Sequence, residues 1–212
     1  MPLLSQKRFP RLWSLFQFWV GGTADKRKLC RLHYKGEQRI LEVGCASGNI
    51  SRAFVKQPGI EFTGLDIDPV AVDLARKHFV SYPNFVFKCQ DVTSLLTSKN
   101  NHFDYILFAG VCHHVNDTSL SQQLNAAAEL LAPTGSLVIV EPLIPDLKDS
   151  WFIRLFIQLE QGCYLRTGKS LVNIIERTEN LSICDNNEFL ITASPFGFPV
   201  CARFGVYRVS KG

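Results

Sequence analysis

Short apolar runs alternate with helical patterns along the middle of the chain. Five such runs end at or beside a polar or acidic residue: 39–43, 62–66, 85–91, 136–141 and the run that begins at residue 103. Runs of this length without strict alternation are typical of strands buried on both faces of a sheet. Between them, apolar residues recur at intervals of three and four, which predicts helices on both faces. The pattern as a whole predicts an α/β fold with a doubly wound, mostly parallel sheet.

The second half of the chain adds further elements to this sheet. A helix is expected from Leu120 to Leu131, followed by a turn over 132–135. Beyond the fifth apolar run, the expected elements are a helix over 151–160, a loop over 162–168, a helix near 170–177, and strands over 188–193 and 202–209. The last two runs are separated by proline and glycine, which predicts an antiparallel pair that closes the sheet.

The first apolar strand runs directly into a glycine-bracketed loop. Glu42 lies near the end of the strand, Gly44 and Gly48 supply an open backbone, and Ala46 keeps the loop thin enough for a ligand to approach. Apolar residues then recur at helical spacing. A strand, a thin loop and a helix start form the nucleotide-binding half of a Rossmann-like fold. A pyrophosphate-binding loop is not expected, because the dinucleotide fingerprint requires glycine where this chain has Ala46, and glycine or alanine where it has Asn49.

The loop resembles the motif of the class I S-adenosylmethionine-dependent methyltransferases, which is acid, any residue, Gly, any residue, Gly or Ala, any residue, Gly. The resemblance covers roughly residues 38–145 and implies S-adenosylmethionine as the cofactor. The loop residues that it assigns to cofactor binding are Glu42, Gly44, Cys45, Ala46 and Gly48. An apolar strand before a glycine-rich turn also occurs as plain α/β packing, so the later landmarks of the chain matter.

The next landmark is an acid at the end of the second strand. Asp66 lies 22 positions after Gly44, close to where this fold places the residue that binds the ribose hydroxyls. Asp68 and Pro69 fit better as the N-cap and first residue of a helix. We therefore assign Asp66 to the ribose and Asp68 to structure.

A third strand also ends in an acid, Asp91. By resemblance, Asp91 meets the adenine amino group and Val92 packs near the ring. Ile67 and Ala109 complete the predicted cofactor site. The alternative for Asp91 is a loop aspartate without a ligand.

The fourth apolar run leads into a histidine pair, which is similar to the fourth-strand motif of small-molecule methyltransferases. His113 and His114 leave the sheet at its carboxyl edge, and Glu141 leaves the neighbouring strand at the same edge. A histidine can take a proton from an oxygen or nitrogen acceptor, and a carboxylate can orient its ring. These three residues are the predicted catalytic group, and the sequence does not distinguish the two histidines. The alternative is that one histidine packs on the cofactor and the other caps the turn near Asn116 and Asp117.

The length of 212 residues fits a single domain. Its predicted segments are an N-terminal helical cover over 1–36, a cofactor-binding core over 37–141, an insertion over 142–169 that shapes the acceptor pocket, and the last helix with the closing strands over 170–212.

Aromatic residues gather in the two segments that flank the core. In the N-terminal segment, the residues expected to cover the cofactor cleft or to join the core are Trp13, Phe16, Phe18, Trp19 and Val20. In the insertion, the candidate pocket residues are Trp151, Phe152, Phe156, Tyr164 and Arg166. Plain packing is the alternative for most of these aromatics. Arg166 is a placed cation, which favours an acceptor with an anionic or hydroxyl group.

Basic residues are concentrated at the N-terminal end. Residues 1–36 hold eight Lys and Arg against Asp25 alone, whereas the whole chain has a formal net charge of +4. This segment is a candidate for contact with an anionic substrate or an RNA backbone. A solvated helix face is the favoured interpretation, because the basic residues lack the interleaved aromatics of a base-stacking surface.

Cysteine usage and hydropathy indicate the compartment. The seven cysteines are odd in number and contain no Cys-x-x-Cys pair, which argues against zinc and disulfides and fits a reducing cytoplasm. The apolar stretch over 12–20 is too short to span a bilayer, and no small-residue cleavage site follows it. We expect no metal and no membrane partner.

These observations predict an S-adenosylmethionine-dependent methyltransferase that moves a methyl group to an oxygen or nitrogen of a small-molecule acceptor by in-line displacement. The alternatives are an RNA methyltransferase and a catalytically silent binding module of the same fold. The RNA alternative is disfavoured because Phe108-Ala-Gly-Val stands where an Asn-Pro-Pro-Tyr-like motif is expected. The sequence leaves the acceptor and the oligomeric state open.

Overall fold

The structure is a computed structural model that describes residues 23–97, 102–157, 162–192 and 200–212. Its seven strands form one sheet in the order β3-β2-β1-β4-β5-β7-β6. The strands are β1 (Arg39–Val43), β2 (Glu61–Asp66), β3 (Phe85–Cys89), β4 (Phe103–Ala109), β5 (Leu131–Pro142), β6 (Leu181–Thr192) and β7 (Val200–Lys211). The first five strands pair in parallel, and β7 is antiparallel to both β5 and β6. The predicted fold class is confirmed.

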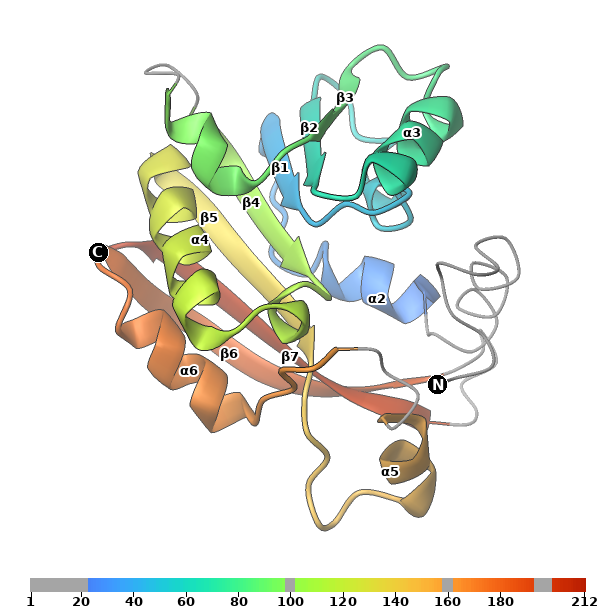
Figure 1. Cartoon of the computed structure of the whole chain (residues 1–212), viewed down its shortest axis with the longest axis vertical. Coiled ribbons are helices and arrows are strands. Elements are labelled where there is room, and N and C mark those ends of the chain that lie inside the picture. Colours follow the sequence, from blue (N-terminus) through green and yellow to red (C-terminus); the bar gives the residue numbers. More distant parts are fainter. Residues whose placement is uncertain (1–22, 98–101, 158–161, 193–199) are drawn as a thin grey trace.

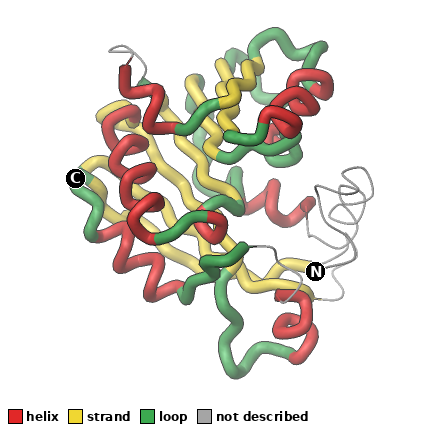
Figure 2. Tube along the Cα trace, viewed as in Figure 1, coloured by secondary structure: helices red, strands yellow, loops and turns green. Residues whose placement is uncertain are grey.

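Helices cover both faces of this sheet (Figures 1 and 2). They are α2 (Thr23–Leu29), α3 (Pro69–His78), α4 (Asp117–Leu130), α5 (Trp151–Ile157) and α6 (Gly168–Glu176). Three short 3-10 helices are η1 (Ser51–Ala53), η2 (Val92–Thr97) and η3 (Cys112–His114). Side chains of α2 and α3 belong to one hydrophobic cluster and those of α4 and α6 to a second one. Each face of the sheet therefore has its own core.

Neighbouring residues of the central strands point into opposite cores. In β1, Ile40 packs in the cluster under α2 and α3, whereas Leu41 packs in the cluster under α4 and α6. In β4, Tyr105 and Ile106 divide in the same way, and all four side chains are buried. Burial on both faces explains why these strands show unbroken apolar runs rather than alternation.

The order of strands reverses at β1, which lies between β2 and β4. Val43, the last residue of β1, pairs with Leu65 of β2 and Phe108 of β4. The connections leave to opposite sides at this point. Ligands of open α/β sheets bind in the crevice at such a switch point, outside the carboxyl ends of the strands.

The prediction of a helix directly after the glycine loop is wrong. Only η1 forms there, and the chain then turns through Pro58 and Gly59 before β2. Phe54 is fully buried against Phe62 and Tyr105, with ring centroids 5.8 Å and 6.1 Å apart. The apolar spacing that suggested a helix instead serves an irregular turn that packs into the core.

Several boundaries also differ from the predicted ones. The strand expected from residue 136 begins at Leu131, which pairs with Phe103 before a register shift. The strand expected from residue 188 begins at Leu181 and pairs with β7 along its length. Helix α4 begins earlier than expected, at Asp117, because the Asn116 side chain accepts from the Ser119 N–H as an N-cap.

Candidate active site

The glycine loop after β1 lies at the switch point of the sheet. Gly44 and Gly48 have φ angles of 71° and 82°, in the left-handed region that favours glycine. A Cβ added to Gly44 would lie 2.3 Å from Val111 Cγ2, so the loop packs directly against the turn after β4. The Cys45 N–H donates to the Leu65 carbonyl over 2.8 Å. The loop is therefore thin and is held between β2 and the turn that carries the histidines.

Asp66 joins this loop to the end of β2. Its Oδ2 accepts from the N–H of Ala46 (2.8 Å) and its Oδ1 accepts from the N–H of Asp68 (2.9 Å). A carboxylate offers about four acceptor positions, so Asp66 keeps capacity for ribose hydroxyls. Asp68 accepts from the N–H groups of Val70 and Ala71 and caps α3, which confirms its structural assignment.

Glu42 lies beneath the loop and not on its open side. It is 1% exposed, and its Oε2 accepts from Ser51 Oγ over 2.5 Å. Burial raises the pKa of Glu42 to about 8, although the Ser51 hydrogen bond acts in the opposite direction. The neutral carboxyl is therefore the favoured form at pH 7. We expect Glu42 to influence a bound ligand through the loop that it supports.

Asp91 occupies the carboxyl end of β3. Its Oδ1 accepts from the N–H (2.9 Å) and Oγ (2.8 Å) of Thr93, and its Oδ2 accepts from Gln123 Nε2 of α4 (3.1 Å). No local pattern indicates the contact with Gln123, because the two residues lie 32 positions apart. The other predicted cofactor residues range from the buried Val92 and Cys45 to the partly buried Ala109 and the exposed Ile67. Contact of these residues with a cofactor stays a prediction.

The structure brings Glu141 and His113 into contact. Glu141 Oε2 lies 2.8 Å from His113 Nδ1, and both side chains are almost fully buried. Glu141 Oε1 accepts from the N–H groups of Val111 (2.5 Å) and Cys112 (2.8 Å). Burial by itself would raise the pKa of Glu141, but the bonds from His113 and the two amides lower it overall. The charged carboxylate therefore orients both the His113 ring and the turn that carries it.

The two histidines differ in environment. His113 is packed under the insertion, since a Cβ added to Gly162 would lie 2.0 Å from His113 Cδ2. His114 is exposed, and its ring centroid lies 4.1 Å from that of His113. The N-cap of α4 is Asn116. The alternative in which one histidine packs on the cofactor and the other caps the turn near Asn116 and Asp117 stays open. The catalytic roles of the histidines and Glu141 stay predictions.

Arg166 points into the protein and not toward an acceptor. It is 7% exposed, and all five N–H groups of its guanidinium donate hydrogen bonds. The acceptors are Asp117 Oδ1, twice, and the carbonyls of Cys112, Val115 and Tyr164. The expectation that Arg166 binds an anionic group of the acceptor is therefore wrong, because this cation is used within the fold.

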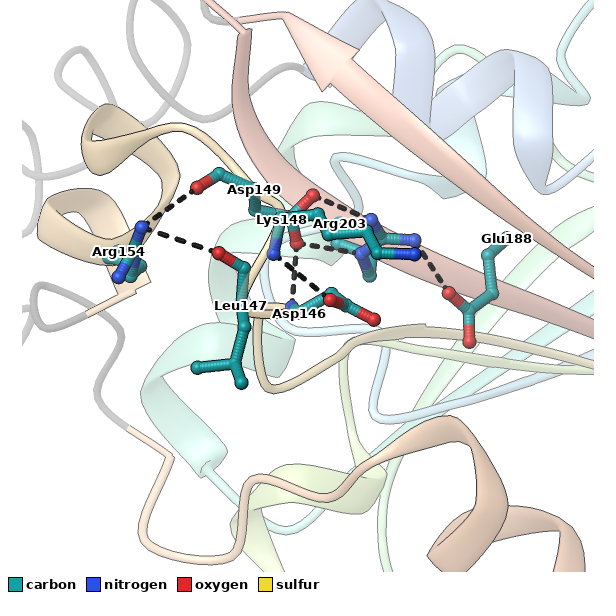
Figure 3. A network of polar contacts seen from close by, with 7 residues as sticks. All are labelled: Asp146, Leu147, Lys148, Asp149, Arg154, Glu188 and Arg203. Carbon is teal, nitrogen blue, oxygen red and sulfur yellow. Dashed lines mark hydrogen bonds and ion pairs between the residues drawn. The ribbon is translucent and has the colours of Figure 1, made fainter.

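The start of the insertion is fixed to β7 by a network of charged side chains (Figure 3). Arg203 Nε and Nη2 donate to the two carboxylate oxygens of Asp149, over 2.8 Å and 2.5 Å. Arg203 Nη1 donates to Glu188 Oε2 of β6 over 2.7 Å. The same Asp149 carboxylate accepts from the Asp146 N–H, and Arg154 donates to the Asp149 carbonyl. The insertion is thus anchored to the closing strands through one bidentate arginine–carboxylate pair.

The predicted aromatic residues of the insertion lie partly at the surface. Trp151 is 62% exposed and stacks on Phe152, with ring centroids 3.8 Å apart. Tyr164 is 44% exposed. In Figure 1, α5 lies beyond the carboxyl end of β5, on the side where a ligand would bind. The Phe156 side chain lies outside the described part of the chain.

Helix α2 contacts the segment that follows the glycine loop. Arg27 Nε donates to the Asn49 carbonyl over 2.7 Å, and Arg31 donates to the Ala53 carbonyl. Lys26 Nζ lies 5.0 Å from the centre of the Phe204 ring, and Asp25 accepts from Thr192. The predicted aromatic cover, Trp13, Phe16, Phe18, Trp19 and Val20, lies outside the described residues.

Among the described residues, no group of three or more His, Cys, Asp or Glu side chains is placed to hold a metal ion. Within the same ranges, no helix is both long and apolar enough to cross a membrane.

Comparisons with known proteins agree with this geometry. Residues 40–135 match the family described as "Methyltransferase domain". A demethylmenaquinone methyltransferase of Chlorobaculum tepidum is 30% identical over 122 residues, which are 58% of this chain and 48% of the relative. A ubiquinone biosynthesis O-methyltransferase of Coxiella burnetii is 32% identical over 101 residues, 47% of this chain and 42% of the relative. The chain thus spans less than half the length of these two relatives.

Solved structures share the fold over most of the chain. The N-methyltransferase NodS from Bradyrhizobium japonicum, in complex with S-adenosyl-L-homocysteine, superposes with a TM-score of 0.68 at 16% identity and covers 96% of this chain and 92% of its own. The resemblance drawn from the glycine loop and the later acids is therefore confirmed. Residues 40–135 thus match a methyltransferase domain, and the chain has the class I methyltransferase fold.

Proposed function

We propose that this protein transfers the methyl group of S-adenosylmethionine to an oxygen or nitrogen atom of a small-molecule acceptor. The observation that carries the proposal is the contact between Gly44 and Val111, which places the glycine loop against the turn of His113 and His114. A cofactor on the loop and a base on the turn would then meet at one edge of the sheet.

The proposed cofactor site runs along the carboxyl ends of β1, β2 and β3. Asp66 binds the ribose hydroxyls, and Asp91 binds the adenine amino group. Glu42 supports the loop from below. A sulfonium cofactor has no phosphate to hold, which fits a loop whose Ala46 N–H is already donated to Asp66.

Methyl transfer from a sulfonium is an in-line displacement, so positioning supplies much of the rate. An oxygen or nitrogen acceptor must also lose a proton, and a histidine titrates in the useful range. In the proposed mechanism the exposed His114 faces the acceptor, and His113 is held in one orientation by the charged Glu141. In this arrangement His114 is the proton acceptor, and His113 is its oriented neighbour.

The proposed acceptor is small and partly apolar. Two relatives are named for steps in menaquinone and ubiquinone synthesis, which are small-molecule pathways. In the described part of the insertion, Arg166 is bonded within the fold, whereas Trp151 and Tyr164 present exposed apolar surface. Apolar contacts with a few polar groups are typical of such pockets. The cytoplasm is the proposed location.

Calorimetry of cofactor binding tests the proposal. The wild-type protein should bind S-adenosylmethionine and S-adenosylhomocysteine and bind NAD more weakly. Loss of hydrogen bonds from a charged carboxylate costs about 1.5 to 3 kcal/mol, so Asp66→Ala should weaken binding roughly 10- to 150-fold. Asp66→Asn, which keeps the shape of the side chain, should also weaken binding.

Asp73→Ala is the matched control, because Asp73 is an exposed acid on α3 that pairs with Arg76. It should leave the affinity unchanged. Unchanged affinity in both Asp66 variants, or tighter binding of NAD than of S-adenosylmethionine, would remove the cofactor assignment. An empty site in the wild type would instead favour the silent binding module.

A further inference from the structure

The turn between β4 and α4 is held from two sides by groups of opposite charge. Glu141 accepts from two N–H groups of the turn, those of Val111 and Cys112, and from the His113 ring. Arg166 donates to two carbonyls of the same turn, those of Cys112 (2.6 Å) and Val115 (2.8 Å). A carboxylate thus satisfies the donors of the turn, and a guanidinium satisfies its acceptors.

The two side chains that hold the turn, Glu141 and Arg166, come from different parts of the chain. Glu141 lies next to the last residue of β5, whereas Arg166 belongs to the insertion, and both lie outside the residues 40–135 that match the methyltransferase family. The backbone of Arg166 is itself fixed, because its carbonyl accepts from the Ile144 N–H over 2.9 Å. Nearby, the Tyr164 N–H donates to the His113 carbonyl over 3.0 Å. The insertion and the histidine turn are therefore joined by both backbone and side-chain bonds.

The guanidinium is suited to this place in a way that another cation is not. It presents five donors in a rigid plane, and here all five are used. Lysine has three donors around one nitrogen and cannot reach Asp117 and three carbonyls together. Buried carbonyls that lose their donors are costly, so the turn would shift to find new partners.

We propose that Arg166 is a positioning residue for the histidine turn. It makes the placement of His113 and His114 depend on the insertion that borders the acceptor site. Arg166 touches neither cofactor nor acceptor in this arrangement and acts through the turn. The catalytic use of the turn rests on the proposed function. The contacts between Arg166 and the turn do not, because they involve no ligand.

Nuclear magnetic resonance tests the proposal without a known acceptor. Because Glu141 is charged, the proton on His113 Nδ1 should give a slowly exchanging, downfield signal in the wild type. In Arg166→Met and Arg166→Lys, this signal should be lost, and the amides of Val111 and Cys112 should exchange at least about tenfold faster. The affinity for S-adenosylhomocysteine should change less than about threefold.

Chemical rescue distinguishes positioning from a general loss of stability. In Arg166→Ala, methylguanidinium should restore the His113 signal and slow amide exchange, whereas methylammonium should not. Arg76→Met is the matched control, because Arg76 also donates to a backbone carbonyl, that of Phe87, far from the turn. It should leave the His113 signal unchanged.

The proposal is overturned if Arg166→Met and Arg166→Lys keep the signal and the slow exchange. It is also overturned if methylguanidinium gives no rescue in Arg166→Ala. A wild-type protein that fails to bind S-adenosylhomocysteine would end the proposed function and leave the test of the turn intact.

Discussion

Two buried glutamates of this sheet edge have opposite protonation states. Glu141 receives two backbone N–H groups and the His113 ring, so its pKa is lowered in spite of its burial. Among the described residues, Glu42 receives a hydrogen bond only from the Ser51 hydroxyl, and burial raises its pKa to about 8. The number of donors around each carboxyl, more than its burial, therefore sets its charge. The charged one lies beside the histidine turn and the neutral one beneath the cofactor loop.

The raised pKa of Glu42 predicts a pH dependence of stability. The folded protein holds the Glu42 proton up to about pH 8, whereas the unfolded chain releases it near the ordinary value of 4.5. Stability from this group is therefore fully present below about pH 4.5 and is lost as the pH rises toward 8. Glu42→Gln removes that loss, so the variant should gain in free energy of unfolding relative to the wild type between pH 5 and 8. Urea unfolding at both pH values measures this difference.

Comparison of the two proteins cancels the titration of other groups, such as His33, whose pKa is lowered by burial. A constant difference between Glu42→Gln and the wild type from pH 5 to 8 would show that Glu42 is ionised in the folded protein.

At the scale of elements, helices and strands are predicted best from the sequence where a local signal determines the structure. The buried strands β1 to β5 carry apolar runs, and Asp68 with Pro69 marks the start of α3. Strands are predicted least well where pairing with a neighbouring strand determines the structure. The middle of β6 holds Asp185, Asn186 and Asn187, which are poor strand formers, and these residues are in a strand because they pair with β7.

The candidate site shows the same difference between residues with a local signal and residues with long-range contacts. Its acids and histidines lie at or just after the ends of strands, and their roles are predicted from those positions. The role of Arg166 was predicted wrongly, because its partners, such as Asp117, lie up to about 50 positions away. A long-range clamp of this kind leaves no periodic or motif signal in the sequence.

The insertion is also held by Arg203, and loss of this contact should make the insertion open more often. Arg203→Met removes the bidentate bond to Asp149, so the segment 143–150 should open more often and be cleaved faster by a protease. Affinity for S-adenosylhomocysteine should be unchanged, since the clamp lies away from β1, β2 and β3. Limited proteolysis with mass spectrometry locates and times the cleavage.

Arg39→Met is the matched control for this element, because Arg39 makes a similar two-point contact with Asp104 at the opposite edge of the sheet. It should not accelerate cleavage in 143–150. Equal cleavage in the Arg203 variant and the wild type would mean that packing alone holds the insertion.

At the scale of the whole molecule, the basic N-terminal charge is partly used by the fold. Arg27 and Arg31 of the α2 region donate to carbonyls after the glycine loop, and Lys28 pairs with Asp25. These contacts reduce the charge that is available for a phosphate backbone. They also tie the α2 region to the segment that follows the glycine loop.

Salt dependence separates a small-molecule enzyme from an RNA enzyme. A protein that neutralises six or more phosphates loses about 10³- to 10⁵-fold in affinity between 50 and 200 mM salt. We expect filter binding of bulk cellular RNA to be weak at both concentrations, while calorimetric binding of S-adenosylhomocysteine changes little. The variant Lys26→Gln with Lys28→Gln lowers the charge without touching the Arg27 bond to Asn49, and it should leave both results unchanged. Tight RNA binding at 50 mM salt that falls steeply at 200 mM and is lost in this variant would contradict the small-molecule assignment and favour RNA as the acceptor.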